Sequence, residues 1–137
     1  MNITYTNDIH DIKASDLQGF FDGWPNPPSP ETHYKMLENS AYIWLAIDSD
    51  TKAVVGFINA ISDKTLSAYI PLLEVLPAYK GQGIGKQMVQ RMIQSLNHLY
   101  MVDIVCDDDL IDFYKTHGFM KGSSMMLRNY DRQAGVL

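Results

Sequence analysis

A chain of 137 residues is long enough to bury one hydrophobic core and short for two, so we expect a single domain over residues 1–137 with a loose tail at 131–137. The formal charge of −5 disfavours a nucleic-acid partner, because nucleic acids select for basic surfaces. The single cysteine excludes an internal disulfide, and no apolar run approaches the roughly 20 residues of a membrane helix. The N-terminus is too polar for a signal peptide, so we predict a cytoplasmic protein with no membrane partner.

The first forty residues predict a strand, two helices and a proline-rich loop between the helices. Residues 2–6 alternate apolar and polar side chains, which is typical of a short strand. Apolar residues on one helical face predict a helix over residues 13–21. The next nine residues hold four prolines and a glycine, so they form a loop. A second helix is expected over residues 30–38, because Ser29 can cap it and Pro30 suits its first position.

The remaining chain alternates apolar strands with helices. Its patterns predict, in order, strands at 41–47, 53–62 and 66–76, a helix from 84, a strand at 100–106, a helix at 107–116 and a last strand at 125–128. The resulting order is β-α-α-β-β-β-α-β-α-β. It indicates an α+β fold with a mixed, mostly antiparallel sheet flanked by helices.

A glycine-rich turn joins the longest predicted strand to the longest predicted helix. The first turn of a helix leaves about four N–H groups without partners at the positive end of the helix dipole, which favours anions. Glycines permit positive φ and remove the Cβ atoms that would hold a ligand away. A Walker A loop would need a glycine at Lys80 and Ser or Thr at Gln87, and the spacing G-x-G-x-G differs from the dinucleotide fingerprint. Both common nucleotide loops are therefore disfavoured.

This turn resembles the acyl-CoA-binding signature of the GNAT superfamily of N-acetyltransferases, Arg/Gln-x-x-Gly-x-Gly/Ala, with Lys80 in place of Arg or Gln. A second segment, DFYKTHGF at residues 112–119, resembles the family's F/L-Y-x-x-x-G-F motif, with Tyr114 as its tyrosine. The order of elements is also the GNAT order. The resemblance implies acetyl-CoA as cosubstrate, held by Val75, Lys80, Gly81, Gln82, Gly83, Ile84, Gly85, Lys86 and Asp107.

The resemblance also implies direct transfer of the acetyl group to a primary amine of a small molecule or peptide. Tyr114 is then the general acid for the leaving thiolate, and the Val75 N–H donates to the carbonyl oxygen. A base must take a proton from the amine. Glu74, Asp103 and a water chain are the alternatives, and strand alternation places Glu74 on the face opposite Val75 unless a bulge intervenes.

Several candidate site residues could have a structural role in place of a functional one. Asp107 stands where the family usually has Asn, and the run of three Asp residues it begins can also cap the following helix. The four histidines show no paired ligand spacing, so we predict no metal. By analogy with the family, the first two helices and their loop form a wall of the acceptor cleft. Substrate contact, or packing onto the sheet, is therefore expected of Phe20, Trp24, His33 and Tyr34.

Other functions stay open at this point. A domain that binds acyl-CoA without turnover would carry the same turn, and a nucleotide-binding fold is disfavoured by spacing alone. The sequence also leaves open the acceptor amine, the preferred acyl chain and the choice between monomer and homodimer.

Overall fold

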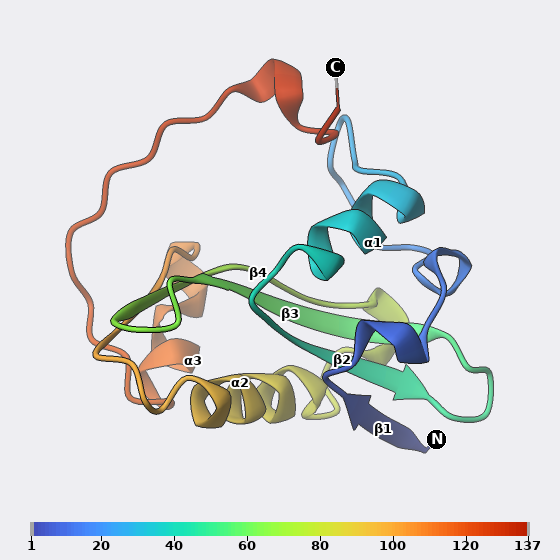
Figure 1. Cartoon of the computed structure of the whole chain (residues 1–137), viewed down its shortest axis with the longest axis horizontal. Helices are drawn as coiled ribbons and strands as arrows, with labels where there is room; N and C mark the ends of the chain where they lie inside the picture. The colour runs from blue at the N-terminus through green and yellow to red at the C-terminus, as the bar shows by residue number, and fades with distance from the viewer. Residues whose placement is uncertain (1, 137) are drawn as a thin grey trace.

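One mixed sheet forms the centre of the protein in the computed structural model, which describes residues 2–136 (Figure 1). The strands lie in chain order across the sheet: β1 (Ile3–Thr6), β2 (Tyr42–Asp48), β3 (Val54–Ser62), β4 (Ser67–Val75) and β5 (Met101–Ile104). The first three pairs are antiparallel, whereas β4 and β5 are parallel. A parallel pair needs a crossover, and a helix supplies it.

Helices cover both faces of this sheet (Figure 1). The crossover helix α2 (Ile84–Ser95) lies on one face and buries a stripe of apolar side chains there, including Ile84, Met88, Val89 and Met92. The opposite face is covered by α1 (Pro30–Glu38) and by the coil that precedes it. The short α3 (Ile111–Lys115) follows β5 and a 3₁₀ turn, η4 (Asp108–Leu110).

Most predicted elements are present with boundaries close to those expected. Helix α1 begins as predicted, because the Ser29 Oγ accepts a hydrogen bond from the Thr32 N–H at 3.1 Å and Pro30 takes the first position. Helix α3 ends before Gly118, which adopts φ of +95°. The α+β class with a mixed sheet is therefore confirmed.

The predicted helix over residues 13–21 is wrong. Only a single 3₁₀ turn, η2 (Ala14–Asp16), forms there. Gly19 and Phe21 both have positive φ, at +86° and +63°, and this backbone conformation cannot continue a right-handed helix. The apolar side chains that suggested the helix are nevertheless buried in the core, because the coil packs them onto the sheet: Leu17, Phe20 and Phe21.

The C-terminal part also differs from expectation. Residues 125–128 were predicted as a last strand, but they pair with no strand within residues 2–136. The tail at 131–137 stays a predicted loose segment; the end of a 3₁₀ turn, η5 (Tyr130–Arg132), falls within it. Gln133 accepts a hydrogen bond from the Asn26 N–H at 2.8 Å. Leu137 lies outside the described residues.

A bulge interrupts β4 at its middle. The register with β3 passes from Tyr69↔Ile61 to Leu72↔Asn59, so the two residues between them oppose a single residue of β3. Pro71 lies in the bulge, one of the few places where a sheet accepts proline. Because the bulge precedes Leu72, Glu74 and Val75 still point to opposite faces, with Val75 against the α2 side.

Candidate active site

The sheet opens between β4 and β5. The two strands pair only from Ser67↔Met101 to Ile70↔Ile104, after which β4 continues to Val75 beside β3 alone. The Leu76 N–H donates to the Val55 carbonyl on β3 at 2.8 Å. Since successive N–H groups of a strand point to opposite edges, the Val75 N–H faces the open side. The end of β4 thus offers a backbone donor in the gap beyond β5.

The glycine turn lies directly after this strand end and presents free amides. Within residues 2–136, none of the N–H groups from Gly81 to Lys86 donates to another backbone or side-chain acceptor, and the first bonded amide of α2 is that of Gln87. Gly81 and Gly83 have φ of +77° and +82°, and a Cβ added at either would meet nothing within 4 Å. The turn therefore combines unsatisfied donors with open space above them, as an anion site requires.

Positive charge surrounds the turn. Lys80 and Lys86 are both exposed at its two ends. Partial burial, and to a smaller extent the charge of Lys86, lower the pKa of His117, which follows α3. These features fit a diphosphate such as that of coenzyme A: the amide N–H groups would donate to its oxygens and the lysines would balance its charge. The first residue of α2, Ile84, and Tyr114 of the DFYKTHGF segment belong to one hydrophobic cluster, so the turn and this segment lie on the same side of the sheet.

Tyr114 is buried on α3, with 6% of its surface exposed, and its ring packs edge-on against Phe113 and Phe119. Burial and the nearby Cys106 raise the pKa of Tyr114 to about 12. Among the described residues, no group accepts from or donates to its hydroxyl, although Tyr114 lines an open hollow. It is therefore a neutral O–H donor at physiological pH with its hydrogen bond still to be made.

Glu74 lies at the end of β4, on the α1 side of the sheet. Its Oε1 accepts a hydrogen bond from the Phe21 N–H at 2.8 Å, across 53 residues of sequence, while its buried Oε2 has no partner among the described residues. Burial raises the pKa of Glu74, the Phe21 N–H and Lys80 oppose this shift, and Asp22 adds to it. A carboxylate with a raised pKa and a free oxygen has the properties of a general base.

The contact between Glu74 and Phe21 is the part of the site that sequence reasoning missed. Phe21 has a positive φ of +63°, and no pattern in the sequence marks a non-glycine residue for that conformation. Glu74 itself was predicted, but its orientation depends on a loop that was predicted as helix.

The four predicted substrate-contact residues divide into two pairs. Phe20 and His33 are buried in the core, and the His33 ring packs 4.3 Å from that of Phe57. Neither His33 nitrogen has a partner among the described residues, and burial lowers the pKa of His33 to about 4. Trp24 and Tyr34 are partly exposed on the same side of the sheet, so they remain open to a ligand.

The acidic residues of β5 and of the segment after it do not take the roles considered for them from the sequence. Asp107 precedes η4, but its side chain caps no N–H group, so the predicted capping role is wrong for Asp107. Asp103 is exposed and stands opposite Tyr69 on β4. That position is about 16 Å along the strand from Glu74, which disfavours Asp103 as a base at the same site. Burial and the three neighbouring Asp charges raise the pKa of Cys106, so its thiol stays neutral.

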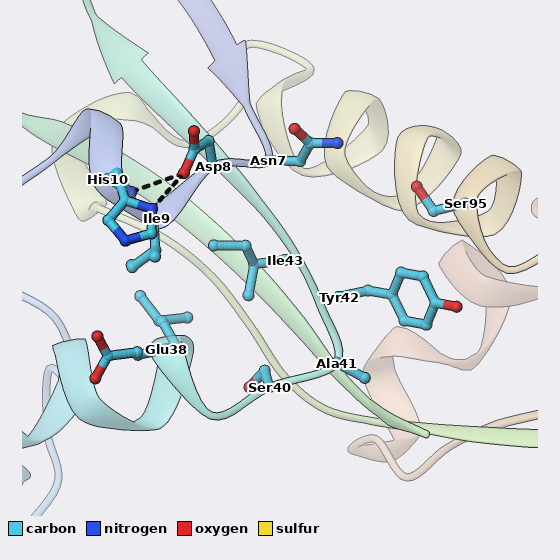
Figure 2. Close-up of a pocket in the computed structure, with 11 residues that line it drawn as sticks. Asn7, Asp8, Ile9, His10, Glu38, Ser40, Ala41, Tyr42, Ile43 and Ser95 are labelled. Carbon is cyan, nitrogen blue, oxygen red and sulfur yellow. Dashed lines mark hydrogen bonds and ion pairs between the residues drawn. The ribbon is translucent and has the colours of Figure 1, made fainter. Parts of the chain in front are cut away.

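A second, smaller pocket of about 270 Å³ lies away from these groups, between the start of β2, the end of α1 and the turn after β1 (Figure 2). None of the predicted site residues lines it. In this pocket His10 Nδ1 lies 3.0 Å from Asp8 Oδ1, and both side chains are largely exposed. Across residues 2–136, no three His, Cys, Asp or Glu side chains are grouped to hold a metal ion, and no helix is long and apolar enough to cross a membrane.

Comparison with known proteins agrees with this geometry. The model of the acetyltransferase (GNAT) family matches residues 8–119. The chain is 43% identical to a candidate acetyltransferase from Deinococcus radiodurans R1, whose crystal structure superposes with a TM-score of 0.94 over 98% of this chain and 94% of that chain. A GNAT family protein of Streptococcus pneumoniae superposes with a TM-score of 0.75 at 28% identity, over 93% of this chain and 98% of that chain.

Curated relatives are similar over a shorter part of their length. A histone acetyltransferase of Glycine max is 30% identical over 123 residues, which is 80% of this chain and 52% of the relative. The chloroplastic GCN5-related N-acetyltransferase 2 of Arabidopsis thaliana is 28% identical over 130 residues, 80% of this chain and 50% of the relative. The chain thus spans about half the length of these relatives. It belongs to the GNAT family of acetyltransferases, whose cosubstrate is acetyl-CoA.

Proposed function

We propose that this protein transfers the acetyl group of acetyl-CoA directly to a primary amine of a small molecule or a peptide. The observation that carries the proposal is the row of free N–H groups from Gly81 to Lys86, next to a strand end whose own N–H is free. In this proposal the turn binds the diphosphate and the gap between β4 and β5 receives the thioester arm. The Val75 N–H donates to the thioester oxygen as that oxygen gains charge.

Proton transfer is assigned to two side chains. Glu74 accepts a proton from the ammonium group, directly or through water, and its raised pKa and free Oε2 support this role. The amine nitrogen then bonds to the acetyl carbon while the carbon–sulfur bond breaks, and the second proton that the nitrogen loses passes to the leaving thiolate. Tyr114 supplies a hydrogen bond or proton to the leaving sulfur. Because its pKa lies near 12, above that of an ordinary thiol, stabilisation by hydrogen bonding is the larger part of its contribution.

The acceptor is assigned to the α1 side of the sheet, where Glu74 and the nearby Asp22 supply negative charge. Charge of this sign attracts a cationic amine. Trp24 and Tyr34 are the aromatic side chains left open to it there. A cytoplasmic location stays a prediction.

A screen of amines tests the proposal. Purified protein is mixed with acetyl-CoA and a panel of polyamines, aminoglycosides, amino sugars and peptides with free amino termini, and release of the coenzyme A thiol is measured. We expect release with at least one amine above the hydrolysis rate without amine. Binding of coenzyme A by calorimetry, with no thiol release across the panel, would instead favour a module that binds acyl-CoA without turnover. Tighter binding of ATP than of coenzyme A would contradict both functions.

A further inference from the structure

We propose that Asp48 and Tyr79 are positioning residues for the cosubstrate. The hydrogen bond between their side chains joins the end of β2 to η3 (Pro77–Tyr79), the 3₁₀ turn that leads into the glycine turn. In this proposal neither side chain contacts acetyl-CoA, and both act through the backbone that follows Tyr79. The inference rests on the proposed function, because it takes the turn from Gly81 to Lys86 as the site of the diphosphate.

The glycine turn has little to hold its own shape. Within residues 2–136, none of the N–H groups from Gly81 to Lys86 donates to a protein acceptor. Glycine also has the widest choice of backbone conformations. A segment of this kind loses conformational entropy when a ligand orders it, unless its neighbours have ordered it beforehand. Its affinity for a ligand should therefore depend on how its two ends are held.

The two ends are held in different ways. At its C-terminal end the turn continues into α2, whose first residue, Ile84, is buried in the core. At its N-terminal end lies η3, whose backbone bonds among the described residues are local, such as that from the Tyr79 N–H to the Leu76 carbonyl at 2.9 Å. Between Leu76 and Ile84, Tyr79 is the only residue that is partly buried, and the others are exposed. The Tyr79 side chain is therefore the contact that ties this end of the turn to the sheet.

Asp48, the partner of Tyr79, is itself fixed from several directions. It is the last residue of β2, pairs with Ile3 of β1, and is only 6% exposed. Its N–H donates to the Ala53 carbonyl at 3.0 Å, and its Oδ1 accepts from the Asp50 N–H at 3.0 Å. Its Oδ2 accepts from the Tyr79 hydroxyl at 2.7 Å, across 31 residues of sequence. Tyr79 is thus bonded to a rigid part of the sheet.

The charge state of both groups favours this bond at neutral pH. The hydrogen bond from Tyr79 lowers the pKa of Asp48, and the same bond raises the pKa of Tyr79. The carboxylate therefore stays ionised and the phenol stays neutral. A hydrogen bond from a neutral hydroxyl to a carboxylate is about twice as strong as one between two neutral groups. The bond is therefore well suited to hold η3 in one place.

Tyr79→Phe tests the proposal, because it keeps the ring and removes the hydroxyl. We expect the Kd for coenzyme A, measured by calorimetry, and the KM for acetyl-CoA to rise about 5- to 10-fold, with kcat within about twofold of wild type. Asp48→Ala should have a similar effect. The double variant should bind no more weakly than either single variant, because all three lose the same bond. Circular dichroism checks the fold, and Tyr79→Phe decides the result if Asp48→Ala does not fold.

Tyr42→Phe is the matched control. It removes a tyrosine hydroxyl that lies 3.3 Å from His98 Nε2, away from the turn, and should leave the Kd for coenzyme A unchanged. A Kd within twofold of wild type in Tyr79→Phe, an equal rise in Tyr42→Phe, or effects of the two single variants that multiply in the double variant would each overturn the proposal.

A shortened thioester separates positioning of the turn from general loosening of the fold. Acetyl-pantetheine lacks the diphosphate, so its kcat/KM should be the same in Tyr79→Phe and wild type; a loss shared with acetyl-CoA would contradict the proposal. Gly83→Ala distinguishes this inference from the proposed function. If Gly83→Ala weakens coenzyme A binding and Tyr79→Phe does not, the positioning role is wrong and the diphosphate site stands. If neither variant weakens binding, the turn is not the diphosphate site and both proposals fail.

Discussion

The two halves of the candidate site are built in different ways. The half that would bind the cosubstrate is a single contiguous turn, and its donors are backbone N–H groups from Gly81 to Lys86. The half that would receive the amine depends on a contact between Glu74 and Phe21, which are 53 residues apart. The first half can be recognised from spacing alone, because local sequence sets the backbone conformation. The second exists only after the N-terminal coil has packed against β4.

This difference predicts that substitutions in the two halves separate cleanly. Changes in the turn and α3 should alter the handling of acetyl-CoA, whereas changes around Glu74 should alter the dependence on pH and on the amine. The predictions below assume an amine that the screen has identified as acceptor, and each one tests this separation.

The largest effect is expected for Tyr114→Phe. The ring packing is kept and the O–H donor is lost, so kcat should fall by about 10²-fold or more while the Kd for coenzyme A stays within about twofold. Stopped-flow thiol release and calorimetry measure the two quantities. Tyr130→Phe removes an exposed hydroxyl outside the hollow that Tyr114 lines, and serves as control. An unchanged kcat would remove Tyr114 from the chemistry.

A smaller loss, on the order of 10-fold to 10²-fold in kcat/KM for the amine, is expected for Glu74→Gln, because water can partly replace the base. The Gln carbonyl can still accept from the Phe21 N–H, so the fold is kept. In the wild type the rate should fall as pH drops through the raised pKa of Glu74, since the base must be ionised. Asp22→Asn removes a charge that raises this pKa and should move the acidic limb to lower pH. If the rate of both variants fell at the same pH as the rate of the wild type, Glu74 would not be the base.

Gly83→Ala should raise KM for acetyl-CoA about tenfold with a smaller effect on kcat. A side chain at positive φ costs about 1–2 kcal/mol, and the added methyl group would enter the open space above the amides. Gly23→Ala is a matched control, because Gly23 also has φ of +82° and open surroundings but lies in the acceptor half. Both variants should lose similar stability. A KM change shared by both would mean that strain, and not the turn, is responsible.

The variant His33→Leu is expected to have the smallest effect on activity, with no change at pH 7. The pKa of His33 is about 4 in the folded protein and 6.5 in its ordinary state, so the unfolded chain binds more protons between these values. Stability therefore rises with pH across this window, and about 2 kcal/mol should be lost on acidification from pH 7.5 to 5. Urea unfolding at several pH values measures the slope. His33→Leu should flatten it, whereas the exposed His10→Gln should not; an equal slope in His33→Leu would assign the acid sensitivity elsewhere.

Much of the fold could be predicted because local patterns and tertiary packing agree. Ser29 and Pro30 define the start of α1 through bonds within one turn, and the apolar stripe of α2 needs only a surface to cover. The predicted helix over residues 13–21 failed where packing overruled periodicity. The apolar side chains there face the core in either conformation, so their spacing did not distinguish a helix from a coil.

By itself, the sequence determined the glycine turn, the tyrosine of α3 and the GNAT family, because these depend on residues near one another in the chain. Only the tertiary structure decided that Glu74 is held by the Phe21 amide, that His33 is enclosed by aromatic rings, and that residues 125–128 pair with no strand among residues 2–136. The physical reason is that burial, pKa shifts and strand pairing depend on neighbours brought together from distant parts of the chain.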